Sequence, residues 1–134
     1  MKKLTLSKAK KKAWDAFSIY IRTRFADSNG YASCVTCGAR KHYKELQAGH
    51  FIGGRHNSIL FDESNCHVQC AGCNVFGRGM FSRYYEYMLK MYGQEVINEL
   101  MEKDREIVKY KVADYLAIEE KYKALVQGFD NSTR

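Results

Sequence analysis

The 134-residue chain contains no proline, and it has no apolar run long enough to cross a bilayer. The missing run excludes a membrane-spanning helix, and Lys2 and Lys3 lead into no apolar signal-peptide core. The absence of proline indicates no particular function. We therefore expect a soluble, cytoplasmic protein whose residues 1–134 form a single domain with a modest apolar core.

The chain has five cysteines, an odd number, and four of them stand at metal-ligand spacing, which argues against a disulfide framework and for a reducing compartment. Four of the five cysteines form two Cys-x-x-Cys pairs, Cys34 with Cys37 and Cys70 with Cys73. Two such pairs are the ligand set of a tetrahedral structural zinc site. Cys66 stands one helical turn before Cys70 and competes as a ligand. The Cys70 pair matches the upstream pair better, so we expect Cys66 to be a free, buried thiol.

Basic residues outnumber acidic ones, 22 to 15, which gives a net charge of +7 and a pI near 9.2. This balance favours a polyanionic partner, most simply nucleic acid, although a solvated basic surface would give the same composition. The predicted basic N-terminal helix, residues 1–28, holds candidate DNA contacts outside its apolar stripe. These candidates are Lys10, Lys11, Lys12, Arg22 and Arg24.

The apolar periodicity predicts an α+β fold, in which a mainly helical chain surrounds a small zinc-stabilised centre. An amphipathic helix is expected over residues 9–27, because apolar residues recur there at steps of three and four. This stripe consists of Trp14, Phe17, Ile21 and Phe25. Short strands are expected over residues 44–52 and 58–63, and a helix is expected to begin at Cys70. Residues 31–78 would then form a compact ββα unit closed by the zinc.

The C-terminal helices are predicted over residues 79–127, and the last of them has an apolar seam with nearly heptad spacing. The seam residues are Val108, Val112, Tyr115, Ile118, Tyr122 and Leu125. Such a seam packs either on the domain's own helices or against a second copy, as in a homodimer. The sequence leaves both arrangements open.

The segment between and around the cysteine pairs carries polar residues in a specific order. Ala48-Gly49-His50-Phe51 lies in the first predicted strand, and residues 61–74 read FDESNCHVQCAGCN. These pieces resemble the HNH, or His-Me finger, nuclease motif, and more closely the NinG family of phage recombination endonucleases. The family also shares FSIYIRTR at residues 17–24, CVTCG at residues 34–38 and Tyr92-Gly93. The resemblance covers about residues 14–100, and residues 1–13 and the last helix lie largely outside it.

The resemblance implies a role for the matching residues. His50 would be the general base that takes a proton from the attacking water. Asn74 would coordinate a catalytic Mg²⁺ or Mn²⁺ ion, and Asn65 would hold His50 in its useful tautomer and orientation. Arg55 and His56, in the glycine-rich loop after His50, are the candidates for DNA contact, with Arg55 gripping a phosphate oxygen.

One position departs from the HNH pattern. Gly49 stands where many HNH enzymes have an aspartate that supplies a second metal ligand. A related branch of His-Me finger nucleases also has glycine there and relies on a single asparagine. Any further ligand therefore stays open among Gln47, Asp62 and His67.

The function implied by the resemblance is that of a metal-dependent DNA endonuclease acting on branched recombination intermediates, such as Holliday junctions and D-loops. It would be phage-encoded and would act in the cytoplasm of the bacterial host, alongside recombination proteins. Two other functions fit the same residues. One is a zinc-stabilised DNA-binding accessory module without nuclease activity, and the other is a sequence-specific HNH endonuclease.

Overall fold

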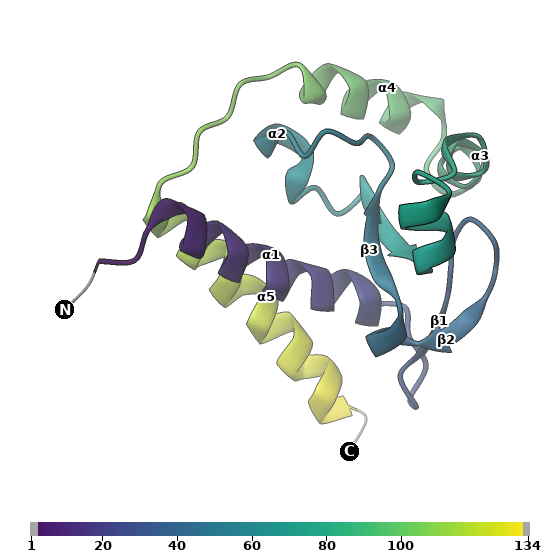
Figure 1. Ribbon diagram of the computed structural model, residues 1–134, viewed down its shortest axis with the longest axis horizontal. Helices are drawn as coiled ribbons and strands as arrows, with labels where there is room; N and C mark the ends of the chain where they lie inside the picture. The colour runs from purple at the N-terminus through teal and green to yellow at the C-terminus, as the bar shows by residue number, and fades with distance from the viewer. Residues whose placement is uncertain (1–2, 133–134) are drawn as a thin grey trace.

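A computed structural model describes residues 3–132, so the ends of the predicted domain, residues 1–2 and 133–134, lie outside the described residues. The chain forms a mixed helical and small-sheet structure, which confirms the α+β class (Figure 1). The elements in chain order are α1 (Leu6–Thr23), β1 (Tyr31–Ser33), β2 (Arg40–His42), η1 (Tyr43–Glu45), β3 (Gln47–His50), α2 (Asn57–Leu60), β4 (Cys66–Gln69), η2 (Gly72–Phe76), α3 (Phe81–Met91), α4 (Gln94–Asp104) and α5 (Val112–Ser132).

The strands form two antiparallel pairs, β1 with β2 and β3 with β4. In the second pair, which we call the central ribbon, Gln47 lies opposite Gln69 and His50 lies opposite Cys66. The strand predicted over residues 44–52 is confirmed in its central part by β3. The helix expected from Cys70 is a short turn of π-helix, η2.

The strand predicted over residues 58–63 is wrong. Ser58 lies in the helical turn α2, and the true second strand is β4 at Cys66–Gln69. The Asp62 carboxylate accepts hydrogen bonds from the amide and hydroxyl of Ser64, at 3.0 and 2.6 Å, and so forms a turn between α2 and β4. All four residues of β4 are buried, so the strand lacks the apolar–polar alternation by which a half-exposed strand is recognised.

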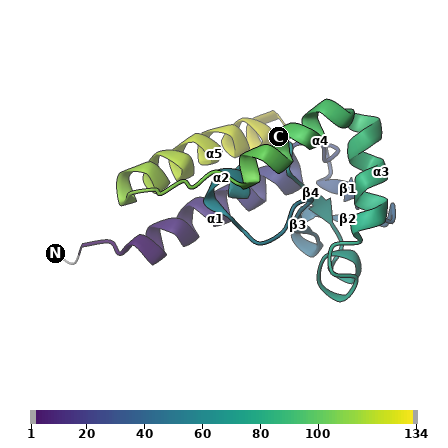
Figure 2. The same ribbon diagram turned by 90° about the horizontal axis from the view of Figure 1, so that it is seen from above.

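The central ribbon is covered by α1 on one face and by α3 with η2 on the other, and α5 lies along α1 (Figures 1 and 2). Phe17 and Ile21 of α1 pack with Ala48 of β3, Cys66 of β4 and Tyr122 of α5 in one buried cluster. The amphipathic helix predicted from the sequence is therefore confirmed. Its last stripe residue, Phe25, is exposed because the helix ends at Thr23.

The seam of α5 packs on the chain's own α1. The two helices run in the same direction, and Tyr115 and Tyr122 are buried between them and their neighbours (Figure 1). The Tyr122 ring meets Phe17 edge to face at 4.9 Å, and its hydroxyl donates to Glu63 Oε2 at 2.8 Å. Of the two arrangements that the sequence leaves open, the structure has the intramolecular one, so the buried part of this seam offers no surface to a second copy.

The helices α3 and α4 confirm the predicted C-terminal helices and enclose a separate apolar cluster. This cluster contains Phe51, Tyr84, Met88, Ile97 and Leu100. Gly93, which separates the two helices, has φ 90°, a value that glycine adopts without strain. Within residues 3–132, none of the helices combines the length and the apolar character that a membrane span requires.

Replacing Tyr122 with alanine should lower the free energy of unfolding by about 3–5 kcal/mol, because the change removes a buried aromatic ring from the α1–α5 contact. Leu125→Ala is the matched control on the same helix. Leu125 is exposed, so its loss should cost less than about 1 kcal/mol. Urea unfolding followed by circular dichroism measures both values, and equal losses would contradict the described packing of α5.

Candidate metal and nucleic-acid site

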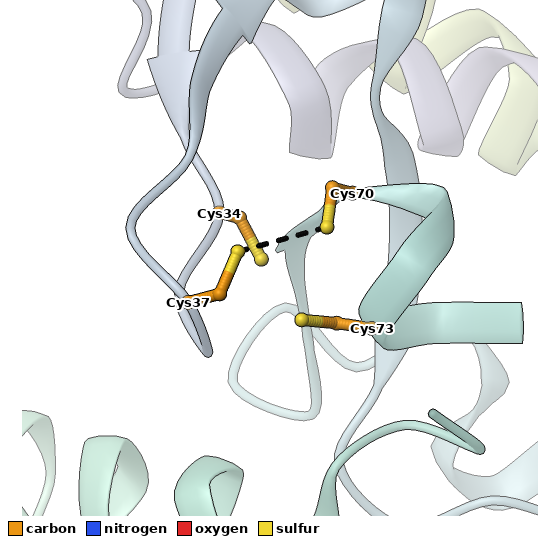
Figure 3. Close-up of side chains that lie close together, drawn as sticks. All are labelled: Cys34, Cys37, Cys70 and Cys73. Carbon is orange, nitrogen blue, oxygen red and sulfur yellow. Dashed lines mark hydrogen bonds between the residues drawn. The ribbon is translucent and has the colours of Figure 1, made fainter. Parts of the chain in front are cut away.

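Four cysteine side chains from two separate segments point toward one another (Figure 3). Cys34 and Cys37 lie on the turn between β1 and β2, whereas Cys70 follows β4 and Cys73 lies in η2. The four sulfur atoms lie within 4.8 Å of one another, and Cys37 Sγ is 3.7 Å from Cys70 Sγ. A zinc–sulfur distance of about 2.3 Å places tetrahedral ligands about 3.8 Å apart. The cluster therefore has the chemistry and the spacing to hold a zinc ion.

Backbone hydrogen bonds shape the first half of this cluster. The Cys34 amide donates to the Ala39 carbonyl at 2.9 Å, and the Gly38 amide donates to the Cys34 carbonyl at 2.8 Å. Gly38 has φ 80°, so the tight turn after Cys37 needs a glycine. The Val35 amide donates to the Val68 carbonyl at 3.0 Å, which fixes the turn against β4.

The thiols of the cluster differ in acidity. Burial raises the pKa of Cys34, but hydrogen bonds from the Thr36 hydroxyl and from nearby backbone amides outweigh it and lower that pKa to about 6. Burial and neighbouring thiols raise the pKa of Cys73 to about 12. Four thiolates in one place therefore require a cation to compensate their charge, which links metal binding to proton release.

Cys66, the other candidate for this cluster, and His67, a candidate for the further metal ligand, are both engaged elsewhere. Cys66 is buried in the α1 core, and burial raises its pKa to about 12, which confirms the expected free, buried thiol. The His67 ring lies between two hydroxyls, Tyr84 at 3.2 Å from Nδ1 and Tyr92 at 2.7 Å from Nε2. Burial lowers the pKa of His67 to about 3, so this imidazole is neutral. His67 is therefore not free to serve as the further metal ligand.

His50 ends β3 and leans toward α1. Its Nε2 atom is 3.1 Å from the Leu60 carbonyl, and its ring stacks on Trp14 with 5.2 Å between ring centroids. A hydrogen on Nε2 that is donated to Leu60 leaves Nδ1 as the basic nitrogen. Burial lowers the pKa of His50, the nearby Arg55 charge lowers it further, and the Leu60 carbonyl opposes both. The imidazole is thus held in the neutral form that a general base requires.

Asn65 holds the backbone after His50 rather than the imidazole. Its Oδ1 accepts from the Ile52 amide at 2.9 Å, and its Nδ2 donates to the Ile52 carbonyl at 3.2 Å. The Asn65 carbonyl also accepts from the Phe51 amide at 2.8 Å. Asn65 is fully buried, so it fixes the loop that leaves β3. The expected contact between Asn65 and the His50 ring is replaced by the Leu60 carbonyl.

Asn74 lies on η2, facing the ribbon beside Gln47 and Gly49. Its Nδ2 donates to Gln47 Oε1 at 2.8 Å, and in the described part of the chain its Oδ1 accepts no hydrogen bond. A Cβ atom added at Gly49 would lie 3.0 Å from Asn74 Oδ1. The amide oxygen of Asn74 therefore lies beside the residue that directly precedes His50.

Gln69, which the sequence did not single out, fills the space beside Gly49. A Cβ atom on Gly49 would lie only 1.8 Å from Gln69 Oε1. The Gln69 amide is fully buried, and its Nε2 donates to Thr36 Oγ1 at 3.1 Å and to the Gly79 carbonyl at 3.0 Å. Its Oε1 has no hydrogen-bond partner among the described residues. The space that a side chain at position 49 would need is therefore filled by a neutral amide oxygen.

The two faces of the ribbon separate the predicted residues. Successive side chains of a strand point to opposite faces, so Gln47 and Gly49 face η2 and α3, whereas His50 faces α1. Asn74 and the orphaned oxygen of Gln69 lie on the first face, and the Trp14 contact of His50 lies on the second.

Asp62 is the remaining candidate for the further metal ligand. Its carboxylate accepts hydrogen bonds from the Ser64 hydroxyl and from Lys103 Nζ, each at 2.6 Å.

The predicted DNA contacts of the loop after β3 are exposed. Arg55 has φ 54°, an unusual value for a residue with a side chain, and its guanidinium lies 4.5 Å from the centroid of a Trp14 ring. His56 Nδ1 is 2.8 Å from Asp104 Oδ1. Arg55 thus stays near His50 with its charge exposed, whereas His56 already has an acidic partner.

The candidate contacts on α1 divide into two groups. Arg22 donates to the Tyr43 and Ser18 carbonyls, at 3.1 and 3.2 Å, and Arg24 donates to the Cys66 carbonyl at 2.6 Å. These arginines join α1 to η1 and to the ribbon, so their first role is structural. Lys11 and Lys12 are exposed, and Lys11 is paired with Asp15 at 2.8 Å, whereas Lys10 is half-buried and its Nζ donates to Asn57 Oδ1 at 3.4 Å.

Comparison with known proteins gives one consistent result. The sequence model of the family described as "Bacteriophage Lambda NinG protein" matches residues 1–132. The match includes the N-terminal segment and the last helix, which the sequence motifs had placed largely outside the resemblance. No solved structure matches the chain.

Three curated relatives have the same name, "Protein ninG". The chain is 29% identical to the one from Escherichia phage 933W, 27% to the one from Escherichia phage lambda and 26% to the one from Salmonella phage P22. Each similarity extends over 123 residues, or 91% of this chain. The chain spans 57–58% of the length of these relatives.

Purified protein should contain zinc in a one-to-one ratio to the chain, as measured by elemental analysis. Cys37→Ser should lose that zinc and melt at a lower temperature, because the metal joins the β1–β2 turn to η2. The affinity for zinc should fall as the pH falls, since protons then compete for the thiolates. Cys66→Ala is the control and should keep its zinc; loss of zinc from this variant would contradict the assignment of the ligands.

Gly49→Ala should lower the free energy of unfolding by about 1–3 kcal/mol, because the new Cβ meets a buried amide that is held on two sides. Gly53→Ala is the control, since a Cβ there meets nothing within 4 Å. Adding Gln69→Ala to Gly49→Ala should cost less than the sum of the two single changes. Additive losses in chemical unfolding would show that the two residues do not compete for space.

Proposed function

Because the chain belongs to the phage lambda NinG family, we propose that it is a metal-dependent DNA endonuclease of the HNH, or His-Me finger, type. Its substrate would be branched DNA formed during recombination, such as a Holliday junction or a D-loop. The single observation that carries the proposal is the meeting of Asn74 with Gly49, the residue directly before His50. The candidate metal ligand Asn74 thereby lies against β3, the strand that also carries the candidate base His50.

The order of elements supports the same proposal. His50 ends the first strand of the ribbon, Asn65 precedes the second strand, and Asn74 follows in the helical turn after it. This order corresponds to the His, Asn and metal-ligand positions of a ββα nuclease centre. The cysteine cluster would act as a structural zinc site that holds η2, and therefore Asn74, against the ribbon.

The oxygen atoms near Gly49 fit a weakly held Mg²⁺ or Mn²⁺ ion. Asn74 Oδ1 and Gln69 Oε1 both lack hydrogen-bond donors in the described structure, and hard cations prefer oxygen ligands. Both are neutral, so binding would depend on a DNA phosphate to complete the site. When bound, the ion would stabilise the charge that develops on the phosphate and on the leaving 3′-oxygen.

The protein's own groups would perform the proton transfer and the positioning. Neutral His50, with Nε2 held by the Leu60 carbonyl, would accept a proton at Nδ1 from the attacking water. The exposed guanidinium of Arg55 would bind a non-bridging phosphate oxygen. Lys10, Lys11 and Lys12 would add phosphate contacts along α1. The products would carry 5′-phosphate and 3′-hydroxyl ends.

A second function is favoured by specific observations. His50 stacks on Trp14 and faces away from Asn74, and Gly49 supplies no ligand, as expected of a DNA-binding recombination accessory module without nuclease activity. A sequence-specific HNH endonuclease would instead cut linear duplex at discrete sites. Homodimer formation, recombination protein partners and a place in the host cytoplasm stay predictions within each of these proposals.

The test is cleavage of a labelled four-way junction beside a linear duplex of the same sequence, in Mg²⁺, Mn²⁺ or EDTA. We expect metal-dependent cutting of the junction, with the rate lowered at least about 100-fold by His50→Ala because the general base is lost. Asn74→Ala should lower it similarly, and both variants should retain zinc. Binding to the junction without cutting in either metal would establish the accessory module instead, and discrete cuts in the duplex would favour the sequence-specific enzyme.

The cleavage rate should persist at pH values below 6.5, because a general base works only when neutral and both burial and Arg55 lower the pKa of His50. Arg55→Gln removes one of those causes, so the acidic limb of its pH–rate profile should move to higher pH. Arg55→Lys keeps the charge and should leave the limb in place. An acidic limb that does not move in Arg55→Gln would contradict His50 as the base whose titration limits the rate.

A further inference from the structure

An exposed apolar turn follows Asn74 directly. In the segment from Val75 to Phe81, which we call the apolar turn, Phe76 is 84% exposed and Val75 and Phe81 are 56% and 54% exposed. Figure 2 shows the η2 turn, in teal, projecting from the body beside the ribbon. Val75 and Phe76 are consecutive, whereas Phe81 begins α3 and its ring stacks on Phe51 with 5.3 Å between ring centroids. Exposed large apolar side chains on a projecting turn suit a surface that meets a partner.

The backbone of the apolar turn is fixed in place. The Gly77 amide donates to the Gly72 carbonyl at 2.7 Å, and the Gly79 amide donates to the Cys73 carbonyl at 2.8 Å. Arg78, Gly79 and Met80 follow one another with φ values of 53°, 88° and 53°. Left-handed conformations in residues with side chains are costly, and they persist where the surrounding structure enforces them. Phe76 is therefore presented on a firm support.

The support is the cysteine cluster itself. Met80 packs against the buried group that contains Cys34, Cys70 and Cys73. A Cβ atom on Gly77 would lie 2.7 Å from Met80 Sδ and 2.9 Å from the Cys73 carbonyl oxygen, so the turn is folded closely on itself. Zinc bound by the four cysteines would hold one end of the apolar turn while the other end enters α3.

The charge around the apolar turn suits a polyanion. Arg78 and Arg83 are both exposed, and the sequence has no acidic residue between Glu63 and Glu86. A partner that presents both negative charge and flat apolar surfaces would fit this arrangement. DNA presents unstacked bases and phosphates together wherever its duplex is interrupted.

We propose that the apolar turn is a wedge that places Phe76 against an unstacked base at the branch point of a DNA junction, while Arg78 contacts the adjoining phosphate. This inference rests on the proposed action on branched DNA and adds the group that reads the branch. Apolar side chains at the point of bending insert into duplex steps in other DNA-bending proteins. Because Phe76 stands two residues after Asn74, the wedge would place the branch beside the cutting site.

The experiment uses a four-way junction with 2-aminopurine, a fluorescent base, at the branch point, and the full chain in buffer without added Mg²⁺ or Mn²⁺, which withholds the metal for cutting and leaves the structural zinc in place. Fluorescence rises when the base is unstacked. We expect wild-type protein to raise it and Phe76→Ala to abolish most of the rise and to weaken junction binding about tenfold, as loss of one base–aromatic contact does. Phe76→Trp should restore both.

Ile107→Ala is the matched control, since Ile107 is 89% exposed and lies far along the chain, between α4 and α5. It should leave junction binding and fluorescence unchanged. Each variant is accepted only with wild-type zinc content and thermal unfolding. Duplex affinity should be the same for Phe76→Ala and wild type, because a continuous duplex offers no unstacked base.

Two failures can be told apart. Junction binding with no fluorescence rise, or with a rise that Phe76→Ala retains, would overturn the wedge and leave the proposed nuclease intact. No binding to junction or duplex would overturn the proposed function together with the wedge.

Discussion

The fold depends on the meeting of four sulfur atoms from two segments that are far apart in the sequence. The β1–β2 turn supplies Cys34 and Cys37, and the end of β4 with η2 supplies Cys70 and Cys73. Apart from this cluster, η2 is a single π-helical turn with little buried surface of its own. A divalent cation at the cluster would therefore decide where η2 lies against the ribbon. Asn74 and the exposed apolar turn take their positions from the same point, so a structural site controls the placement of the residues proposed to act on DNA.

A second constraint is the lack of space at Gly49. Gln69 is held by Thr36 and Gly79, and its free amide oxygen occupies the place where any side chain on Gly49 would begin. An aspartate at position 49 would have to displace a buried, hydrogen-bonded amide. The glycine at position 49 is thus required by the packing of the ribbon against the β1–β2 turn. In the proposed enzyme, Gln69 would partly compensate by offering a neutral oxygen beside Asn74, and cation binding without DNA would then be weak.

The sequence alone predicted an element correctly wherever a pattern of a few residues determines that element. The spacing of the two cysteine pairs predicted the cluster, and steps of three and four predicted α1, because both patterns act over a few residues. The strand at residues 58–63 was wrong because β4 is buried throughout and a turn at Asp62 shifts the strand toward Cys66. Gln69 could not be found, since its importance comes from its register opposite Gln47 and its approach to Gly49. The partner of His50 was missed for the same reason: Leu60 comes near only through the fold.

The opposite orientation of His50 and Asn74 limits how the proposed chemistry can work. If both residues act on one phosphate, that phosphate must lie at the end of β3, where His50 is the last residue of the strand and the ribbon no longer separates the two faces. The loop after β3 runs past this end, and Asn65 fixes it through the backbone of Ile52. Arg55 in that loop extends its charge over Trp14, beside the His50 ring. A phosphate drawn to Arg55 would reach the end of the strand from the side of His50, whereas the apolar turn on the far side would meet the DNA next to Asn74. Substrate held at both places would span the end of the ribbon, which a bent or branched DNA can do and a straight duplex does poorly.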